Sequence, residues 1–244
     1  MMSLLDLTLT TPAENLALDE ALLDECDGGS GGESLRFWEP TTPFVVVGYA
    51  NSVAHEVQVT ACQTAGVPIH RRCTGGGTVL QMPGVLNYNL VLRIPENGPL
   101  SQLSTTNQWI MSRLCDALAG LSLASNSEEL VVRGVSDLCL GNRKVMGSAQ
   151  RRKKSALVFH GSLLLNADLS LIEKFLRFPS KQPDYRADRS HLDFCTNLSL
   201  ESGAAKQAIA RAWGSPTPLT QIPQDRLNQL LHDRYGRADW NHKL

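Results

Sequence analysis

Two stretches of the sequence carry residue types that could bind and activate an anionic substrate. The first spans residues 71–80 and places Arg71 and Arg72 directly before three glycines at 75–77. Glycines permit positive φ and let a ligand approach the backbone, so their amides can point at an anion or a carbonyl. Arg72 could add a bidentate contact to a phosphate or a carboxylate. The same residues would also suit a basic hairpin with a flexible turn, because a short glycine motif is weak evidence by itself.

The second stretch spans residues 137–150 and has the sequence DLCLGNRKVMGSAQ. Its Gly-Asn pair at 141–142 is a plausible hairpin turn, which would set Lys144 near the start of the following strand. A lysine in that position can bind an anionic substrate or can be an ordinary hairpin lysine. His160 follows shortly after, between Phe159 and Gly161, and equally suits a site or a satisfied core position.

Composition excludes several classes of protein. The 244 residues are 42% hydrophobic and 19% charged, with a formal net charge of −1, so nothing indicates a nucleic-acid or membrane partner. No apolar run is long enough to span a bilayer, and the start lacks the features of a signal peptide, so we expect a cytoplasmic protein. The six cysteines form no CxxC pair and the six histidines no HExxH pattern. We therefore expect reduced thiols and no structural metal.

Helix and strand signals alternate irregularly along the chain. Thr11 to Glu14 form a capping box with proline at the first helical position, which predicts a helix ended by the glycines at 28–32. Hydrophobic periodicity predicts further helices at 53–65, 103–121, 169–176, 204–213 and 224–235. Strands are expected at 4–9, 35–39, 44–49, 67–70 and 79–93, with short strands over 129–165 and a polar, proline-bearing loop at 179–191.

No repeat, low-complexity tract or linker divides these elements. We therefore expect one catalytic domain over residues 1–244 without a C-terminal accessory domain. The centre is rich in strands but lacks strict strand-helix alternation, so the fold class predicted is α+β, with mixed, largely antiparallel β-sheets flanked by helices.

The order of these sequence blocks resembles the lipoate-protein ligase A family. The blocks that carry the resemblance are NLALDE at 15–20, FWE at 37–39, VG at 47–48, RRCTGGGTV at 71–79, LNY at 86–88, DL at 137–138, RKVMGSA at 143–149 and HGSLLL at 160–165. Several ordered blocks at the right separations are far more specific than any one of them, and they cover the chain from about residue 15 to its end. The resemblance implies the catalytic-domain fold shared by biotin and lipoate protein ligases.

The resemblance also implies an ATP-dependent lipoate-protein ligase. Such an enzyme activates lipoate with ATP and Mg²⁺ to an acyl adenylate, then transfers the lipoyl group to a lysine of a lipoyl-carrier protein. Lys144 matches the family's invariant lysine, which neutralises the carboxylate and the α-phosphate as they meet. The other positions that match the family's nucleotide and lipoyl-adenylate site are Arg72, Gly75, Gly76, Gly77, Thr78, Val79, Leu80, Asn87, Asp137, Ser148 and His160. Asn87 and Asp137 could equally bond turn backbone.

Partners follow from the same resemblance. The expected acceptor is the lipoyl domain of a 2-oxoacid dehydrogenase, the glycine cleavage H protein or a similar carrier. Ligases of this type usually carry an accessory domain for the adenylation step, so a separate accessory chain could supply that part.

An octanoyl or lipoyl transferase that works through a cysteine thioester is the main alternative. Leu157 stands where one transferase class has its cysteine, and residues 125–137, where another class has it, contain none. Cys73 and Cys139 lie close to the motifs, but their apolar neighbours favour a packing role. A member that only binds its ligands and a biotin ligase are the remaining alternatives.

The sequence departs from the family pattern at two places. Gln81 replaces a frequent histidine, which argues against a role for that position in orienting the acyl head. The segment from Pro179 to Arg186 is longer than the resemblance would lead us to expect, and this could accompany a subfamily with a different acceptor.

Overall fold

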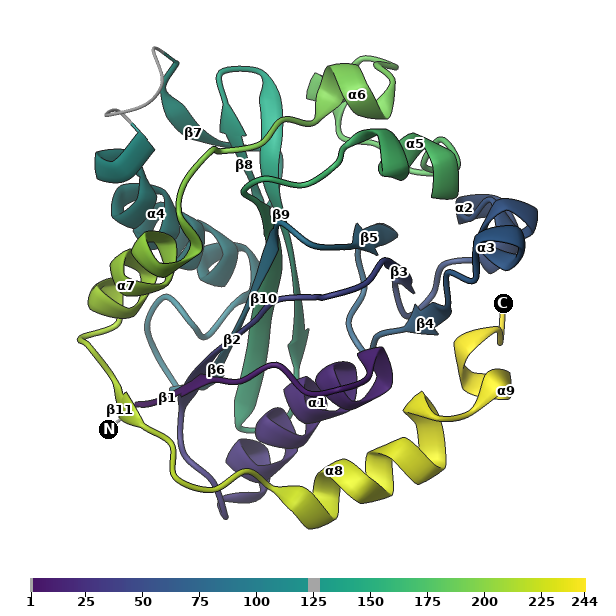
Figure 1. Cartoon of the computed structure of the whole chain (residues 1–244). Coiled ribbons are helices and arrows are strands. Elements are labelled where there is room, and N and C mark those ends of the chain that lie inside the picture. Colours follow the sequence, from purple (N-terminus) through teal and green to yellow (C-terminus); the bar gives the residue numbers. More distant parts are fainter. Residues whose placement is uncertain (1, 123–127) are drawn as a thin grey trace.

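The fold is built on two β-sheets, as the computed structural model shows for residues 2–122 and 128–244 (Figure 1). The larger sheet has eight strands in the order β11-β1-β2-β6-β10-β9-β8-β7. Their bounds are β1 Ser3–Asp6, β2 Ser34–Trp38, β6 Val85–Arg93, β7 Leu130–Arg133, β8 Asp137–Leu140, β9 Arg143–Arg152, β10 Ala156–Leu164 and β11 Thr217–Pro218. All pairings from β2 to β7 are antiparallel, while β1 is parallel to both β2 and β11. The predicted fold class, α+β with a largely antiparallel sheet, is confirmed.

The smaller sheet carries the glycine segment. It has the order β4-β3-β5, with β3 Phe44–Val47 between β4 Ile69–Arg71 and β5 Val79–Gln81. β4 is parallel to β3, and β5 is antiparallel to it on the opposite side. The glycine segment is therefore a crossing from one side of β3 to the other, so the hairpin interpretation is wrong.

Helices cover both faces of the large sheet. On one face, α1 Pro12–Gly28 packs with α8 Gln224–Leu230 and the π-helical turn η2 Leu231–Tyr235; on the other, α4 Leu103–Ser122 packs with α7 Ser202–Ala212. The helices on each face bury apolar side chains against the sheet, and the two faces therefore have separate core clusters. A third cluster lies between the small sheet and the helices α3 Val59–Ala65 and α5 Ser170–Phe175.

Local sequence signals account for several helix and strand ends. Thr11 and Glu14 form the predicted capping box, and Gly29, at φ 83°, ends α1. The predicted hairpin turn joins β8 to β9, with Gly141 at φ 58°. Lys144 is accordingly the second residue of β9, as expected.

Other boundaries differ from the predictions. The helix expected at 53–65 is two short ones, α2 Val53–Glu56 and α3, because Val57 is extended and forms a bridge with Leu176. The strand expected at 79–93 breaks into β5 and β6 at Gly84, whose φ is 86°. The short strands expected over 129–165 include two longer ones, β9 and β10.

The remaining elements are short and lie between residues 184 and 241. The loop expected at 179–191 holds a 3₁₀ turn, η1 Asp184–Arg186, and leads into α6 His191–Phe194. The C-terminal helix α9 Ala238–Asn241 contacts β4. Over the residues described, no helix combines the length and the apolar character needed to cross a bilayer.

Candidate active site

A cavity of about 460 Å³ lies between strands β8 to β10 of the large sheet, the glycine segment with β5, and the segment from α5 to α6. It gathers all but one of the predicted site residues from distant parts of the chain; Gly75 is the exception. The predicted residues that line it are Arg72, Gly76, Gly77, Thr78, Val79, Leu80, Asn87, Asp137, Lys144, Ser148 and His160.

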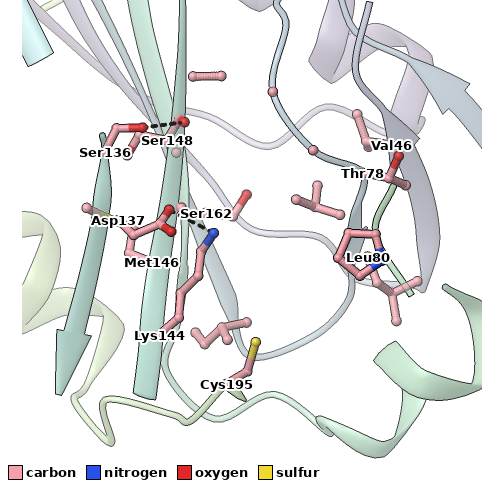
Figure 2. Close-up of a pocket in the computed structure, with 18 of the residues that line it drawn as sticks. Val46, Thr78, Leu80, Ser136, Asp137, Lys144, Met146, Ser148, Ser162 and Cys195 are labelled. Carbon is pink, nitrogen blue, oxygen red and sulfur yellow. Dashed lines mark hydrogen bonds and ion pairs between the residues drawn. The ribbon is translucent and has the colours of Figure 1, made fainter. Parts of the chain in front are cut away.

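Lys144 is oriented by a carboxylate inside this cavity. Its Nζ lies 2.8 Å from Asp137 Oδ1, and Figure 2 shows the two side chains pointing toward each other. The Tyr185 hydroxyl donates to Asp137 Oδ2 at 2.7 Å. Burial, followed by the charge of Asp137, raises the pKa of Tyr185, so this hydroxyl stays protonated and keeps donating. The chain Tyr185–Asp137–Lys144 therefore fixes the direction of one ammonium group.

Gly147 provides the room for this lysine. A Cβ at Gly147 would lie 2.7 Å from both Cε and Nζ of Lys144. Side-chain atoms do not approach so closely, so any larger residue at this position would displace the amine.

Arg72 supports the glycine segment from within. Its Nη2 donates to the carbonyls of Gly75 and Gly77 at 2.6 and 2.7 Å, and its Nε donates to Thr74 Oγ1 at 2.9 Å. Burial lowers the pKa of Arg72 to about 10, so it stays protonated at neutral pH. These bonds give Arg72 a role in shaping the loop, and the anion contact predicted for it stays a prediction.

Two residues of the glycine segment form part of the cavity wall. Gly76 has φ 86°, a conformation that favours glycine, and Gly76 and Gly77 line the cavity wall. Among the described residues, no acceptor forms a hydrogen bond with the amides of Gly76 and Gly77. Two N–H groups are thus left to bind a carbonyl or an anion.

His160 is a neutral support for the same loop. Thr74 Oγ1 lies 2.6 Å from His160 Nε2 and also accepts the bond from Arg72, so the threonine proton points to the imidazole nitrogen. Burial, reinforced by the Arg72 charge, lowers the pKa of His160 to about 3. The imidazole is therefore uncharged at neutral pH, and the interpretation as a satisfied histidine fits this geometry.

Asn87 belongs to a side-chain network rather than to a turn. Its amide exchanges two hydrogen bonds with Gln81, at 2.9 and 2.8 Å, and Ser162 Oγ donates to Asn87 Oδ1 at 2.6 Å. All three residues line the cavity. Gln81, which departs from the family pattern, therefore holds Asn87 in place.

Ser148 lies in the cavity wall near Lys144. Its hydroxyl is 2.9 Å from the Tyr88 hydroxyl. Its backbone N–H donates to the carbonyl of Ser136, the residue before β8, and its carbonyl accepts from the Ser136 hydroxyl. The rest of the wall is largely apolar and includes Trp38, Val46 and Ile172. An apolar cavity with a few convergent polar groups suits a substrate with a hydrocarbon chain and a polar head.

Residues that follow the motifs by a long stretch of chain escaped prediction. Among them, Arg186 and Cys195 line the cavity, and Tyr185 forms the hydrogen bond to Asp137. The only signal for Tyr185 and Arg186 was the unusual length of the 179–186 segment that contains them, and no signal pointed to Cys195. Cys195 is the one cysteine of the six in the cavity wall.

The cysteines near the motifs are packed in the interior. Burial raises the pKa of Cys73 to about 12 and also raises that of Cys139. Cys139 Sγ lies 3.4 Å from the Tyr185 hydroxyl. Neither thiol lines the cavity wall, which agrees with the packing role expected for both.

Comparison with known proteins identifies relatives along nearly the whole chain. Residues 11–211 match the family described as lipoyl protein ligase A/B catalytic domain. The chain is 30% identical to the octanoyltransferase LipM of Moorella thermoacetica, over 97% of this chain and 96% of that one. It is 24% identical to lipoate-protein ligase A subunit 1 of Thermoplasma acidophilum, over 96% and 95%. A crystal structure of lipoate-protein ligase A bound with ATP superposes with a TM-score of 0.81 at 22% identity, covering 98% of each chain, which shows a shared fold.

Proposed function

The chain belongs to the lipoyl protein ligase A/B catalytic domain family, and from this premise we propose that it joins a lipoyl or octanoyl group to a lysine of a lipoyl-carrier protein. The observation that carries the proposal is the Lys144–Asp137 pair beside an apolar cavity whose wall includes the glycine segment. Membership makes the protein an enzyme of the lipoate ligase and transferase class. The identity of the acyl donor is part of the proposal.

The side chains support amide formation in a simple way. The acyl chain lies along the apolar wall, and its carbonyl meets the free amides of Gly76 and Gly77. As an acceptor lysine attacks that carbonyl, negative charge develops on its oxygen, and oriented N–H groups and the Lys144 ammonium stabilise it. Lys144 acts without reorganisation because Asp137 already holds it.

One candidate donor is the lipoyl adenylate, made from lipoate, ATP and Mg²⁺. Lys144 and the glycine amides would bind its carboxyl and phosphate groups, since both are anions that a fixed cation and backbone amides suit. Within the described residues no group of three metal-ligating side chains is found, so Mg²⁺ would bind together with the nucleotide phosphates. A relative named as a ligase subunit supports this route, with a second chain assisting.

The second candidate donor is an acyl thioester on a carrier protein. Cys195 in the cavity wall favours it, because a thiol beside the reacting carbonyl can hold the acyl group between two transfers. The relative named as an octanoyltransferase favours it as well.

Intact mass spectrometry of a lipoyl domain tests the proposal. The domain is incubated with the protein and one of three donors: lipoate with Mg-ATP, preformed lipoyl adenylate, or octanoyl-acyl carrier protein without ATP. Acylation by at least one donor is expected. The preformed adenylate bypasses the step that an accessory chain would assist, so no mass gain in any tube, with a domain that a known ligase does modify, would contradict the proposal.

A further inference from the structure

Cys195 is held beside Lys144 by the backbone. The residue follows α6 directly, and residues 144 and 195 form an isolated parallel β-bridge, with Thr196 N donating to Lys144 O at 2.9 Å. Figure 2 shows the Cys195 thiol and the Lys144 amine reaching into the same cavity. The backbone therefore holds residue 195 next to residue 144.

A second observation, independent of the thiol, is a buried cation in the wall of the same cavity. Arg186 lines the cavity, is 4% exposed, and its Nη2 is buried without a hydrogen-bond partner. Its guanidinium carbon lies 4.7 Å from the centre of the Phe194 ring and 4.8 Å from that of Phe178. No carboxylate in residues 2–122 or 128–244 forms an ion pair with it. A buried cation without a counterion is costly, so an anionic group beside it in the working enzyme would repay that cost.

The charges around Cys195 come from three elements. Burial raises the pKa of its thiol, and the charges of Lys144 on β9 and Arg186 on η1 lower it. Asp137 and Cys139 on β8 act in the same direction as burial. Two cations on different elements, Lys144 and Arg186, thus favour the deprotonated thiol against the effect of burial.

We propose that Cys195 is a catalytic nucleophile that carries the acyl group as a thioester, with Arg186 as a positioning residue for the charge that develops there. This inference rests on the proposed transfer to a carrier lysine and commits the donor to an acyl thioester. It places the nucleophile at neither of the two positions that the family pattern suggests.

The two transfers balance without a further reagent. In the first, Cys195 Sγ attacks the carbonyl carbon of the donor thioester; the new C–S bond forms, the old one breaks, and the thiol proton ends on the departing carrier thiol. In the second, the amine of the acceptor lysine attacks the Cys195 thioester. A C–N bond forms, the C–S bond breaks, and an amine proton returns to Cys195.

The test is to trap the intermediate. The protein is incubated with octanoyl-acyl carrier protein, quenched in acid and weighed intact. We expect one octanoyl mass gain that neutral hydroxylamine removes, as it removes thioesters but not amides, and peptide mapping should place it on Cys195.

Variants then connect the intermediate to turnover. Cys195→Ala and Cys195→Ser should lose the intermediate and reduce transfer from octanoyl-acyl carrier protein by at least about 100-fold. Cys115→Ser is the matched control, since Cys115 is also partly buried but lies on α4 outside the cavity wall, and it should transfer normally. Arg186→Gln should keep the thiol but shift its alkylation by iodoacetamide to higher pH, a change that a merely structural residue would not produce.

The outcomes separate the inference from the proposed function. If the Cys195 variants acylate the lipoyl domain as fast as the wild type with whichever donor works, the nucleophile is wrong while the function stands. The same holds if the wild type turns over octanoyl-acyl carrier protein without a hydroxylamine-sensitive mass gain, or uses only the adenylate donors. If no donor yields acylated domain, the proposed function itself fails.

Discussion

At the scale of single residues, the site depends on side chains that hold one another rather than on isolated reactive groups. Lys144 is directed by Asp137, which in turn accepts a hydrogen bond from Tyr185. A lysine side chain that is otherwise free to rotate loses this freedom in advance, so that binding a substrate does not have to order it.

Lys144→Ala is expected to reduce the rate of lipoyl-domain acylation by a factor of 100 or more. The variant lacks a cation near the charge that develops in the transition state, which costs about 3 kcal/mol of transition-state stabilisation. The fold should remain, because the Lys144 side chain is 28% exposed and its ion pair contributes only about 1 kcal/mol to stability. Acylation is followed by intact mass and folding by urea unfolding. Near-normal turnover in a folded variant would remove Lys144 from the mechanism.

The pKa values of two histidines determine how we expect the free energy of unfolding to depend on pH. Burial lowers the pKa of His70 to about 4 and that of His160 to about 3, from about 6.5 in the unfolded chain. Below pH 6.5 the unfolded chain therefore binds protons that the folded protein does not. As the pH falls, the free energy of unfolding decreases by about 1.4 kcal/mol per pH unit for each histidine. The loss continues until each folded-state pKa is reached.

His70→Gln removes the contribution of one of the two histidines to the pH dependence of the free energy of unfolding. It leaves the cavity unchanged, since His70 is not part of its wall. Urea unfolding between pH 7 and pH 5 should give a shallower decline for the variant than for the wild type. Equal slopes would mean that His70 titrates normally in the folded protein.

At the scale of elements, the glycine segment is shaped by its neighbours. It crosses from β4 to β5 over the end of β3, and Gly48, the residue after β3, lies beneath it. A Cβ at Gly48 would come 2.2 Å from the carbonyl oxygen of Gly76. Because that neighbour is backbone, no side-chain rotation can relieve the contact.

Gly48→Ala should therefore displace the glycine segment, with a cost of about 1–3 kcal/mol in stability. It should also lower acylation by about 10-fold or more, since a shift of about 1 Å in a positioning group has large effects on rate. The control is Gly203→Ala in α7, where a Cβ would meet nothing within 4 Å and stability should be unchanged or slightly higher. A Gly48→Ala enzyme with wild-type rate would show that the segment need not hold its position.

At the scale of the whole molecule, the C-terminal helix supports the site from outside the cavity. Asn241 Oδ1 accepts the Arg71 amide at 3.0 Å, and the Trp240 indole donates to the Arg71 carbonyl at 3.0 Å. Arg71 in turn donates to the carbonyls of Gly48 and Asn51 at 2.8 and 2.7 Å. The end of the chain thus fixes the strand from which the glycine segment departs (Figure 1).

Asn241→Ala should leave the buried Arg71 amide without an acceptor and cost about 1–3 kcal/mol. We expect a lower melting temperature and a raised KM, with a smaller effect on kcat because no reacting group moves. Asn228→Ala, which alters an exposed asparagine on α8, should change neither. A raised melting temperature or an unaltered KM for Asn241→Ala would show that the helix does not support the site.

Features that depend on neighbours in sequence could be predicted directly. Two such features were predicted correctly: the capping box of Thr11 and Glu14, and the hairpin turn at Gly141. Each depends on hydrogen bonds or φ angles within a few neighbouring residues. The family blocks likewise indicated Lys144 and the glycine segment before any fold was known. The sequence by itself therefore determined the fold class, the family and those residues of the cavity wall that belong to the motifs.

Only the tertiary structure decided how these parts face one another. The order of strands β4-β3-β5 turned a presumed hairpin into a crossing, and the burial of Arg72 turned its donors inward onto the loop. Cys195 came to lie beside Lys144 through a single bridge between distant segments. Strand order and burial arise from the packing of the whole chain, and no local pattern of residue types encodes them.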